Sequence, residues 1–207
     1  MDLEVWGAFV VASTALLLIP GPTVLLVLSY AISQGRKVAV ATVAGVALGD
    51  LLAMTASLLG LGAVVLASAT LFTVLKWVGA AYLVYLGIKL FRSAAEASLD
   101  PVDKAGDTTT GSVFMHATAV TALNPKSIVF FIAFVPQFID AEAALLSQFS
   151  ILITTFVALA AVNALAYALL ADKLRQRIAK PSVLAWFSRI GGGTLIAMGV
   201  ATAAFRR

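Results

Sequence analysis

The sequence predicts an all-α integral membrane protein with six transmembrane helices, and three observations favour this fold class. Of the 207 residues, 61% are hydrophobic and 12% are charged, whereas soluble domains average roughly 45–50% apolar and about 25% charged residues. The mean hydropathy is +1.03. The apolar runs are continuous and do not alternate with polar residues, which indicates helices and not the strands of a membrane β-barrel.

Hydrophobic runs follow one another along the chain with short connections. A spanning helix needs about 20 apolar residues, and we expect spans at residues 3–33, 38–67, 71–91, 112–135, 143–171 and 184–205. The polar stretch at about 93–111 is a linker between the third and fourth spans. Residues 1–207 therefore form one transmembrane domain, with no room for a second domain.

The first and fourth runs contain helix breakers. Pro20-Gly21-Pro22 interrupts the first run, and Asn124-Pro125 interrupts the fourth. Proline inside a helix removes a backbone hydrogen bond and clashes with the preceding turn, so we expect both spans to be split into half-helices. The freed N–H and C=O groups cannot face lipid and must be buried in protein or line a wet cavity. The sequence thus predicts two broken helices around a cavity.

The two halves of the chain resemble each other, at about 1–92 and about 112–207. The proline breaks correspond, Asp50 falls opposite Asn163, and two glycine pairs align in the third and sixth spans, namely Gly79 with Gly191 and Gly87 with Gly199. Each half has three spans, an odd number, so the repeats must be inverted. Inverted repeats with matched broken helices indicate a secondary transporter. They also occur in some channels and membrane redox carriers.

The distribution of basic residues predicts the orientation of the helices. Ten Lys and Arg residues fall on one side of the predicted spans and three, among them Arg206 and Arg207, on the other. The positive-inside rule then places both termini outside the cytoplasm. The excess of basic residues reflects loops that face anionic lipid, and not a nucleic-acid partner.

Asp50 is the one acid deep inside a predicted span. An acid there costs about 2.5–3.5 kcal/mol on insertion scales, and the neighbouring Gly45 and Gly49 form a small-residue face that lets another helix approach closely. Asp50 should therefore point into the bundle. It is a candidate proton carrier or partner for a substrate ammonium group, and the structural alternative is a salt bridge to Lys126.

Lys126 is the cation nearest the middle of a span. It is suited either to a substrate carboxylate or to neutralising Asp50. The half-helix N-termini after the breaks present free N–H groups and a positive dipole end, which also suit a carboxylate. The candidate substrate- and proton-binding residues are Asp50, Lys126, Asn124, Pro20, Gly21, Pro22, Thr23, Pro125, Ser127 and Asn163. Close helix packing is expected at Gly45, Gly49, Gly79, Gly87, Gly191 and Gly199.

Other polar residues fit the membrane interface better than a site. Lys76 and Arg189 begin the third and sixth spans, and His116 begins the fourth, so we interpret them as interfacial residues. The chain has no cysteine, which excludes disulfides, thiolate metal sites and a thiol redox carrier. It has no nucleophile–base pair and no metal-ligand cluster. We therefore predict neither an enzyme nor a cofactor.

The sequence resembles the LysE/RhtB family of bacterial amino-acid exporters over nearly its whole length. The resemblance rests on the motifs Pro20-Gly21-Pro22, Ser33-Gln34-Gly35-Arg36, the segment from Gly45 to Asp50, Lys76 to Gly87, Asn124-Pro125-Lys126 and Pro136-Gln137-Phe138-Ile139-Asp140. It implies a proton-driven exporter in the bacterial inner membrane, with the Pro-Gly-Pro, Gly-Asp and Asn-Pro-Lys positions along the pathway. It is closer to the RhtB-like branch, which favours neutral and small polar amino acids.

The expected function is export of amino acids or close derivatives by proton antiport. The expected partners are the amino acid, protons and membrane lipid, with a homo-oligomer also open. One buried acid beside one lysine suits a zwitterion better than a metal cation. Exporters of another small solute or of a metal cation, and a non-transport membrane subunit, remain the alternatives.

Overall fold

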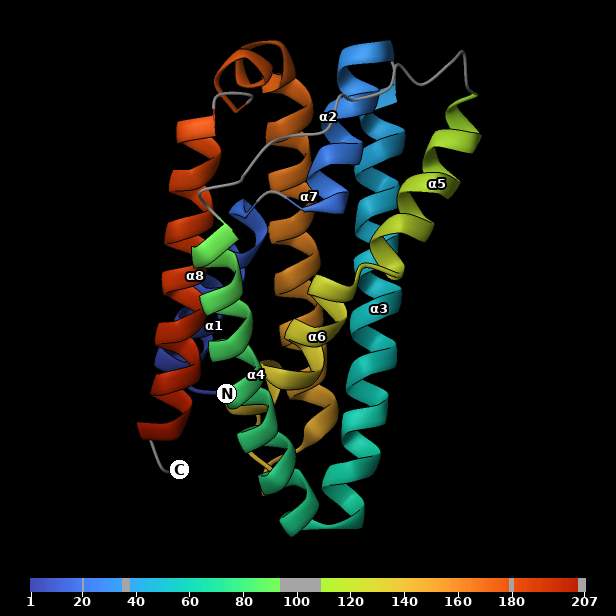
Figure 1. Cartoon of the computed structure of the whole chain (residues 1–207). Coiled ribbons are helices and arrows are strands. Elements are labelled where there is room, and N and C mark those ends of the chain that lie inside the picture. Colours follow the sequence, from blue (N-terminus) through green and yellow to red (C-terminus); the bar gives the residue numbers. More distant parts are fainter. Residues whose placement is uncertain (20, 35–37, 94–108, 179–180, 205–207) are drawn as a thin grey trace.

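The computed structural model describes residues 1–19, 21–34, 38–93, 109–178 and 181–204, and these form a bundle of helices without a strand (Figure 1). Some side chains in the last part of α4, in α7 and in α8 are also outside the description. The helices are α1 (Leu3–Leu18), α2 (Pro22–Gln34), α3 (Ala39–Ala67), α4 (Ala69–Ser93), α5 (Thr110–Ala122), α6 (Pro125–Ala133), the short 3-10 helix η2 (Val135–Phe138), α7 (Leu145–Ile178) and α8 (Pro181–Ala204).

The first expected span is broken into α1 and α2, which are bent by 56° to each other. Helix α1 ends at Leu18, and Ile19 has an extended backbone. Helix α2 begins at Pro22, a position where a missing N–H group is harmless because the first N–H groups of a helix have no partner within it. Pro20 lies outside the described residues.

The second break separates α5 from α6, with a bend of 43°. The side chain of Asn124 accepts a hydrogen bond from the backbone N–H of Lys126 and so caps α6. Pro125 is the first residue of α6, where its fixed backbone angle suits a helix start. The local reason for the break is therefore an asparagine cap followed at once by a proline.

Three described helices are long and apolar enough to cross a membrane, and there are five candidate spans if each bent pair counts as one. The three are α3, the part of α4 to Lys89 and the part of α7 from Leu145 to Ala171. Helix α8, with 24 residues, is not among these candidates, so the sixth span remains a prediction. Helix α8 ends in the lower half of Figure 1, where the chain also begins.

Glycines bring helices α3 and α5 together. A Cβ at Gly45 would lie 2.5 Å from the carbonyl oxygen of Phe114, and one at Gly49 would lie 2.6 Å from Cβ of Thr121. Neither position can carry a side chain without moving α5. This close packing agrees with the expected small-residue face and sets Asp50, the next residue, against the second break.

Glycines also bring α4 against α8. A Cβ at Gly87 would meet the carbonyl oxygen of Gly192, and one at Gly199 would meet that of Ala80. Gly79 instead packs against Ala133 of α6. The described contact in the Gly-Gly-Gly run is thus made by Gly192, whereas the surroundings of Gly191 lie outside the described residues.

The two largest apolar clusters occupy opposite halves of the bundle. One joins α1, α6, η2 and the N-terminal half of α7, and its largest members are aromatic; they include Phe9, Phe130, Phe131, Phe134 and Phe156. The other joins α2, the start of α3 and the C-terminal half of α7 through smaller side chains such as Val24, Val27, Val46 and Ala164. Both helix breaks lie between these clusters.

Candidate functional site

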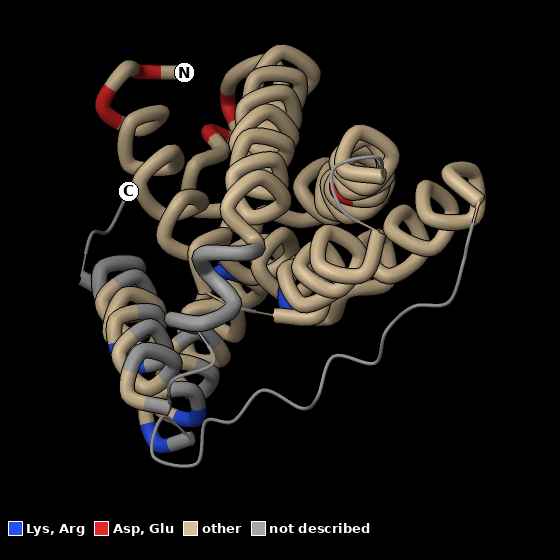
Figure 2. The backbone as a smooth tube through the Cα atoms, turned by 90° about the horizontal axis from the view of Figure 1, so that it is seen from above, with Lys and Arg blue, Asp and Glu red and all other residues tan. Residues whose placement is uncertain are grey.

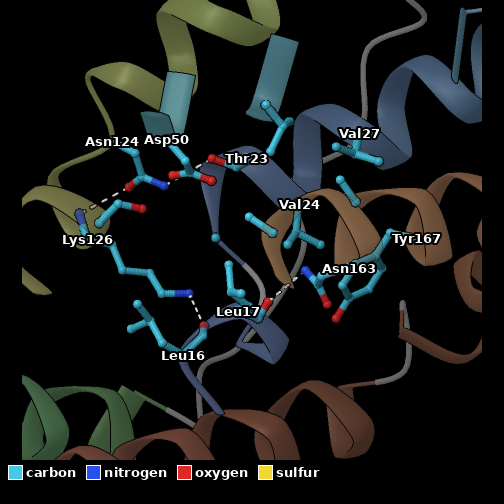
Figure 3. Close-up of a pocket in the computed structure, with 15 residues that line it drawn as sticks. Leu16, Leu17, Thr23, Val24, Val27, Asp50, Asn124, Lys126, Asn163 and Tyr167 are labelled. Carbon is cyan, nitrogen blue, oxygen red and sulfur yellow. Dashed lines mark hydrogen bonds between the residues drawn. The ribbon is translucent and has the colours of Figure 1, made fainter. Parts of the chain in front are cut away.

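A small polar cavity lies where the two breaks meet (Figure 3). Its volume is about 30 Å³, enough for roughly one water molecule. The lining comes from both half-helix pairs, α3 and α7, and comprises Leu16, Leu17, Gly21, Thr23, Val24, Val27, Val46, Asp50, Asn124, Lys126, Ser127, Ala160, Asn163, Ala164 and Tyr167. An amino acid does not fit this volume, so binding requires the helices to move apart.

Lys126 reaches from the start of α6 to the end of α1. Its Nζ atom donates hydrogen bonds to the backbone oxygens of Leu16 at 2.8 Å and of Ile19 at 2.7 Å. The C-terminal end of a helix carries unpaired carbonyls and a partial negative charge, so a cation there is stabilising. Lys126 therefore caps the broken helix α1 and ties the two breaks together.

Two side chains of α7 complete this cap. Asn163 donates from Nδ2 to the oxygen of Leu17 at 3.1 Å, and the Tyr167 hydroxyl donates to the oxygen of Leu18 at 3.2 Å. The four consecutive carbonyls from Leu16 to Ile19 are thus all bound by side chains. Burial without such partners would be unfavourable, because the hydrocarbon core of a membrane offers no water to bind free carbonyls.

Tyr167 was not among the residues expected from the sequence. It lies four residues after Asn163 and therefore on the same face of α7. That spacing was the available signal, since Asn163 was already a candidate and a tyrosine on its face has a hydroxyl within reach of the same break. An isolated tyrosine in an apolar run is otherwise interpreted as a packing residue.

A second set of hydrogen bonds joins α2 to the α5–α6 break. Asn124 donates from Nδ2 to Oγ1 of Thr23 at 3.1 Å, and Thr121 donates to the same oxygen at 3.5 Å. Asn124 is buried, and its other side-chain atom caps α6 through the N–H of Lys126. One asparagine therefore fixes the start of α6 and holds it against α2.

Asp50 lies at the edge of this network but does not join it. The residue is 2% exposed, and its Oδ1 atom is buried without a hydrogen-bond partner. The expected structural alternative was a salt bridge to Lys126. That pair is not formed among these described residues, because Nζ of Lys126 is bound to the backbone of α1 instead. An unpaired acceptor in a buried site is expensive, so Asp50 is placed to take up a donor or a proton.

The structure brings most of the expected site residues into one place. Seven of the ten line the cavity: Asp50, Lys126, Asn124, Gly21, Thr23, Ser127 and Asn163. Pro22 and Pro125 begin α2 and α6 and set the bends rather than the lining. Pro20, the last of the ten candidate residues, lies outside the residues that the structure describes.

The polar residues interpreted as interfacial lie elsewhere. His116 accepts or donates through Nδ1 in a 2.8 Å hydrogen bond with the Tyr30 hydroxyl, which joins α2 to α5. Lys76 lies over the ring of Phe72 at 5.3 Å. Arg189 is exposed on α8. In the described part of the chain, no three His, Cys, Asp or Glu residues come together as metal ligands would.

The bent apolar helix pairs and the polar cavity between them define a multi-pass membrane protein. The sequence matches the LysE type translocator family over residues 14–204. The chain belongs to that family, and it is a transporter rather than an enzyme.

Relatives match the chain from end to end. The homoserine/homoserine lactone efflux protein of Salmonella typhimurium is 34% identical over 206 residues, which cover 100% of this chain and 99% of the relative. An uncharacterized membrane protein of Vibrio cholerae is 32% identical over 200 residues, 97% of each chain. No solved structure matches the chain.

Proposed function

We propose that this protein exports homoserine or a similar small α-amino compound from the bacterial cytoplasm in exchange for protons. The family is a translocator family, and relatives with full coverage are named for efflux of homoserine and its lactone. The observation that carries the proposal is the buried Oδ1 atom of Asp50, which has no partner and lines a cavity at the meeting point of two helix breaks.

The substrate group recognised by Asp50 is the α-ammonium. Homoserine and homoserine lactone share this group, but only homoserine has a free carboxylate. A site that serves both compounds cannot depend on an ion pair with the carboxylate. Lys126, the cation suited to that pair, is instead bound to Leu16 and Ile19. This arrangement supports recognition through Asp50 and leaves Lys126 a role in holding α1.

The exchange follows from competition for one carboxylate. Ionised Asp50 binds the substrate ammonium from the cytoplasm, where protons are scarce. A proton from outside then neutralises Asp50, which removes the attraction and releases the substrate. Neutral Asp50 also avoids the cost of a bare charge in the membrane during the return step. Substrate and proton thus share one site and cannot be bound together.

The proposed architecture is six spans in two inverted repeats, with both termini outside. Helix packing supports it, because α3 contacts α5 and α6 while α7, its counterpart, contacts α1 and α2. Helix α4 contacts α8, the corresponding helix of the other half. A two-fold axis within the membrane would exchange these pairs, and the cavity with Asp50 and Asn163 would lie close to that axis.

Transport in proteoliposomes tests the proposal. Purified protein is reconstituted, and uptake of labelled homoserine is measured with an imposed pH gradient and without it. We expect gradient-driven uptake by the natural protein and none by Asp50→Asn, which keeps the shape of the side chain but cannot carry a proton. Glu4→Gln is the matched control, because Glu4 is exposed in the first turn of α1 and lines neither cavity.

Two outcomes would reject the proposal. Failure of both homoserine and its lactone to move under any gradient would show that the substrate class is wrong. Equal gradient-driven transport by Asp50→Asn and the natural protein would instead show that another group carries the proton. Loss of transport in Glu4→Gln as well would point to general damage and would remove the evidence for a special role of Asp50.

A further inference from the structure

A second, much larger cavity opens at the end of the bundle that holds the N-terminus and the end of α8. Its volume is about 1580 Å³, against about 30 Å³ at the helix breaks. Helices α1, α4 and α8, with η2 and the loop after it, provide its walls. The proposed function has not used this space or the Lys76 motif that lines it.

Two hydrogen-bond donors in this cavity lack acceptors. Lys76 is half-buried, lies over the Phe72 ring and makes no ion pair with any described residue. Gln137 has a buried Nε2 atom without a hydrogen-bond partner. A cation in a span normally pairs with an anion or with carbonyls, and a buried amide donor normally has an acceptor. Both donors line the same cavity, which indicates an anionic ligand.

Acidic side chains line the same cavity nearer to solvent. Asp2, Asp140 and Glu142 are exposed members of the lining, and Figure 2 shows acidic residues gathered beside the N-terminus. The cavity thus pairs two inner donors with acids at its rim. This distribution suits a small molecule that carries one carboxylate and one ammonium group.

The large cavity continues the path from Asp50. Ala12 lines it, and Leu16, one turn further along α1, lines the small cavity; one turn is about 5.4 Å of helix. Ser127 of α6 lines the small cavity, whereas Phe134, the residue that follows α6, lines the large one. Phe130 lies between them and is 1% exposed, with its ring 4.9 Å from that of Phe134 and 5.9 Å from that of Phe156. Buried phenylalanine rings therefore lie along α6 between the residues that line the two cavities.

We propose that the large cavity is the outer release site of the transport path, where Lys76 and Gln137 hold the carboxylate of the exported solute. The assignment rests on the proposed function and its orientation. In this proposal the ammonium and the carboxylate of the substrate are bound at different places along the path. Asp50 binds the ammonium group of the solute. Lys76 and Gln137 bind the carboxylate, where the compound has one, only after the solute has passed Phe130.

Tryptophan fluorescence gives a direct test that does not depend on transport. Trp77 lines the large cavity, and the chain has three tryptophans, so the double variant Trp6→Phe/Trp186→Phe leaves Trp77 as the reporter. Reconstituted protein is titrated with homoserine from the side that carries the termini. We expect a saturable change in emission, with the half-saturating concentration raised about tenfold or more by Lys76→Gln, because a charged hydrogen bond is lost.

Matched variants and ligands sharpen the test. Lys76→Arg should restore most of the binding, whereas Lys89→Gln, an exposed lysine on the same helix, should leave the titration unchanged. Homoserine lactone lacks the carboxylate, so its titration should be the same in Lys76→Gln as in the parent. If Lys76 acts only in folding, Lys76→Gln would change the half-saturating concentrations of both ligands. That result would contradict the proposal.

Other outcomes separate the two proposals. If the emission of Trp77 does not respond to homoserine but changes with the phosphatidylglycerol content of the vesicles, the cavity binds a lipid headgroup. This result would reject the release site. A titration that is insensitive to Lys76→Gln would reject it as well. If homoserine is not transported but acetate and homoserine still perturb Trp77 through Lys76, the carboxylate site stands and the exporter proposal fails.

Discussion

Nζ of Lys126 lies 2.7 Å from the carbonyl oxygen of Ile19, and this contact joins the end of one half-helix to the start of another 107 residues away in the sequence. The lysine binds the last turn of α1 where the backbone is most negative. A substrate carboxylate would therefore have to displace two backbone carbonyls before it could pair with Lys126. The same contact makes the position of α1 sensitive to any event that draws the lysine away.

Replacement of Lys126 should affect substrates with and without a carboxylate alike. Lys126→Met keeps most of the length of the side chain but leaves the oxygens of Leu16 and Ile19 without their lysine donor, so we expect transport of homoserine and of homoserine lactone to fall by a similar factor of about ten or more. The measurement is initial uptake of both compounds into proteoliposomes. A loss confined to homoserine would show that the lysine binds the carboxylate itself.

Tyr167→Phe tests the third member of the cap by removal of one hydroxyl. Hydrogen bonds between membrane helices contribute about 0.6 kcal/mol on average, so we expect a small decrease in stability and a transport rate reduced about two- to three-fold. Asn163→Leu removes the neighbouring bond to Leu17 and should act in the same direction. If Tyr167→Phe instead abolishes transport while the protein stays folded, the hydroxyl contacts the substrate or carries protons.

Close packing at Gly49 should be indispensable. Gly49→Val would place side-chain atoms where Thr121 and the Thr118 oxygen already lie, so α5 must move and the neighbouring Asp50 with it. We expect either poor insertion into the membrane or a folded protein that does not transport. Expression in the membrane and uptake assays distinguish these two results. Gly60→Val is the matched control on the same helix, since nothing lies within 4 Å of a Cβ at Gly60. Equal behaviour of the two variants would contradict the role of the α3–α5 contact.

The orientation of the chain can be tested because it contains no cysteine. We expect Glu142→Cys to react with an impermeant thiol reagent in intact cells and Lys104→Cys to react only after the membrane is opened. The reason is the ten-to-three distribution of basic residues. Permeabilised cells provide the control that both cysteines are reactive. The reverse labelling would place the termini in the cytoplasm and turn the proposed release site into an entry site.

Much of the helical arrangement was predictable from the sequence, for local reasons. Pro22 and Asn124-Pro125 break a helix through their own local chemistry, because proline lacks a backbone N–H group and asparagine caps a helix start. Both breaks are found at these residues. The convergence of Asp50 and Lys126 on one cavity followed from the expense of buried charge, which pushes both side chains away from lipid.

The partners of these residues were not predictable in the same way. The sequence predicts a substrate carboxylate or Asp50 as the partner of Lys126, and it does not indicate the bonds that Lys126 makes to the backbone of Leu16 and Ile19. Backbone carbonyls have no signature in the sequence, and which ones are left unpaired depends on the residue at which α1 stops. The contact of Gly192 with Gly87 and Phe91 is a similar case, because the rotation of α8 about its own axis decides which residues face α4.

Exchange of the side chains at residues 50 and 163 tests whether transport needs only a carboxylate in the cavity or also the hydrogen bond that the amide of Asn163 donates. The two positions correspond in the proposed inverted repeat, and both line the cavity. If the carrier needs only one carboxylate near the two-fold axis, Asp50→Asn/Asn163→Asp should transport better than Asp50→Asn alone. We expect no such rescue. Asn163 donates its amide hydrogen to the oxygen of Leu17, and an ionised aspartate has no hydrogen to donate.

In the double variant the new carboxylate would face the carbonyls at the end of α1, where the backbone is already negative. It would also attract Nζ of Lys126 away from Leu16 and Ile19, so two parts of the cap would be lost together. Uptake of labelled homoserine with and without a pH gradient measures the outcome, and Asn163→Asp alone supplies the control for damage to the cap. Gradient-driven uptake restored by the double variant would show that the position of the carboxylate is interchangeable and that the cap is dispensable.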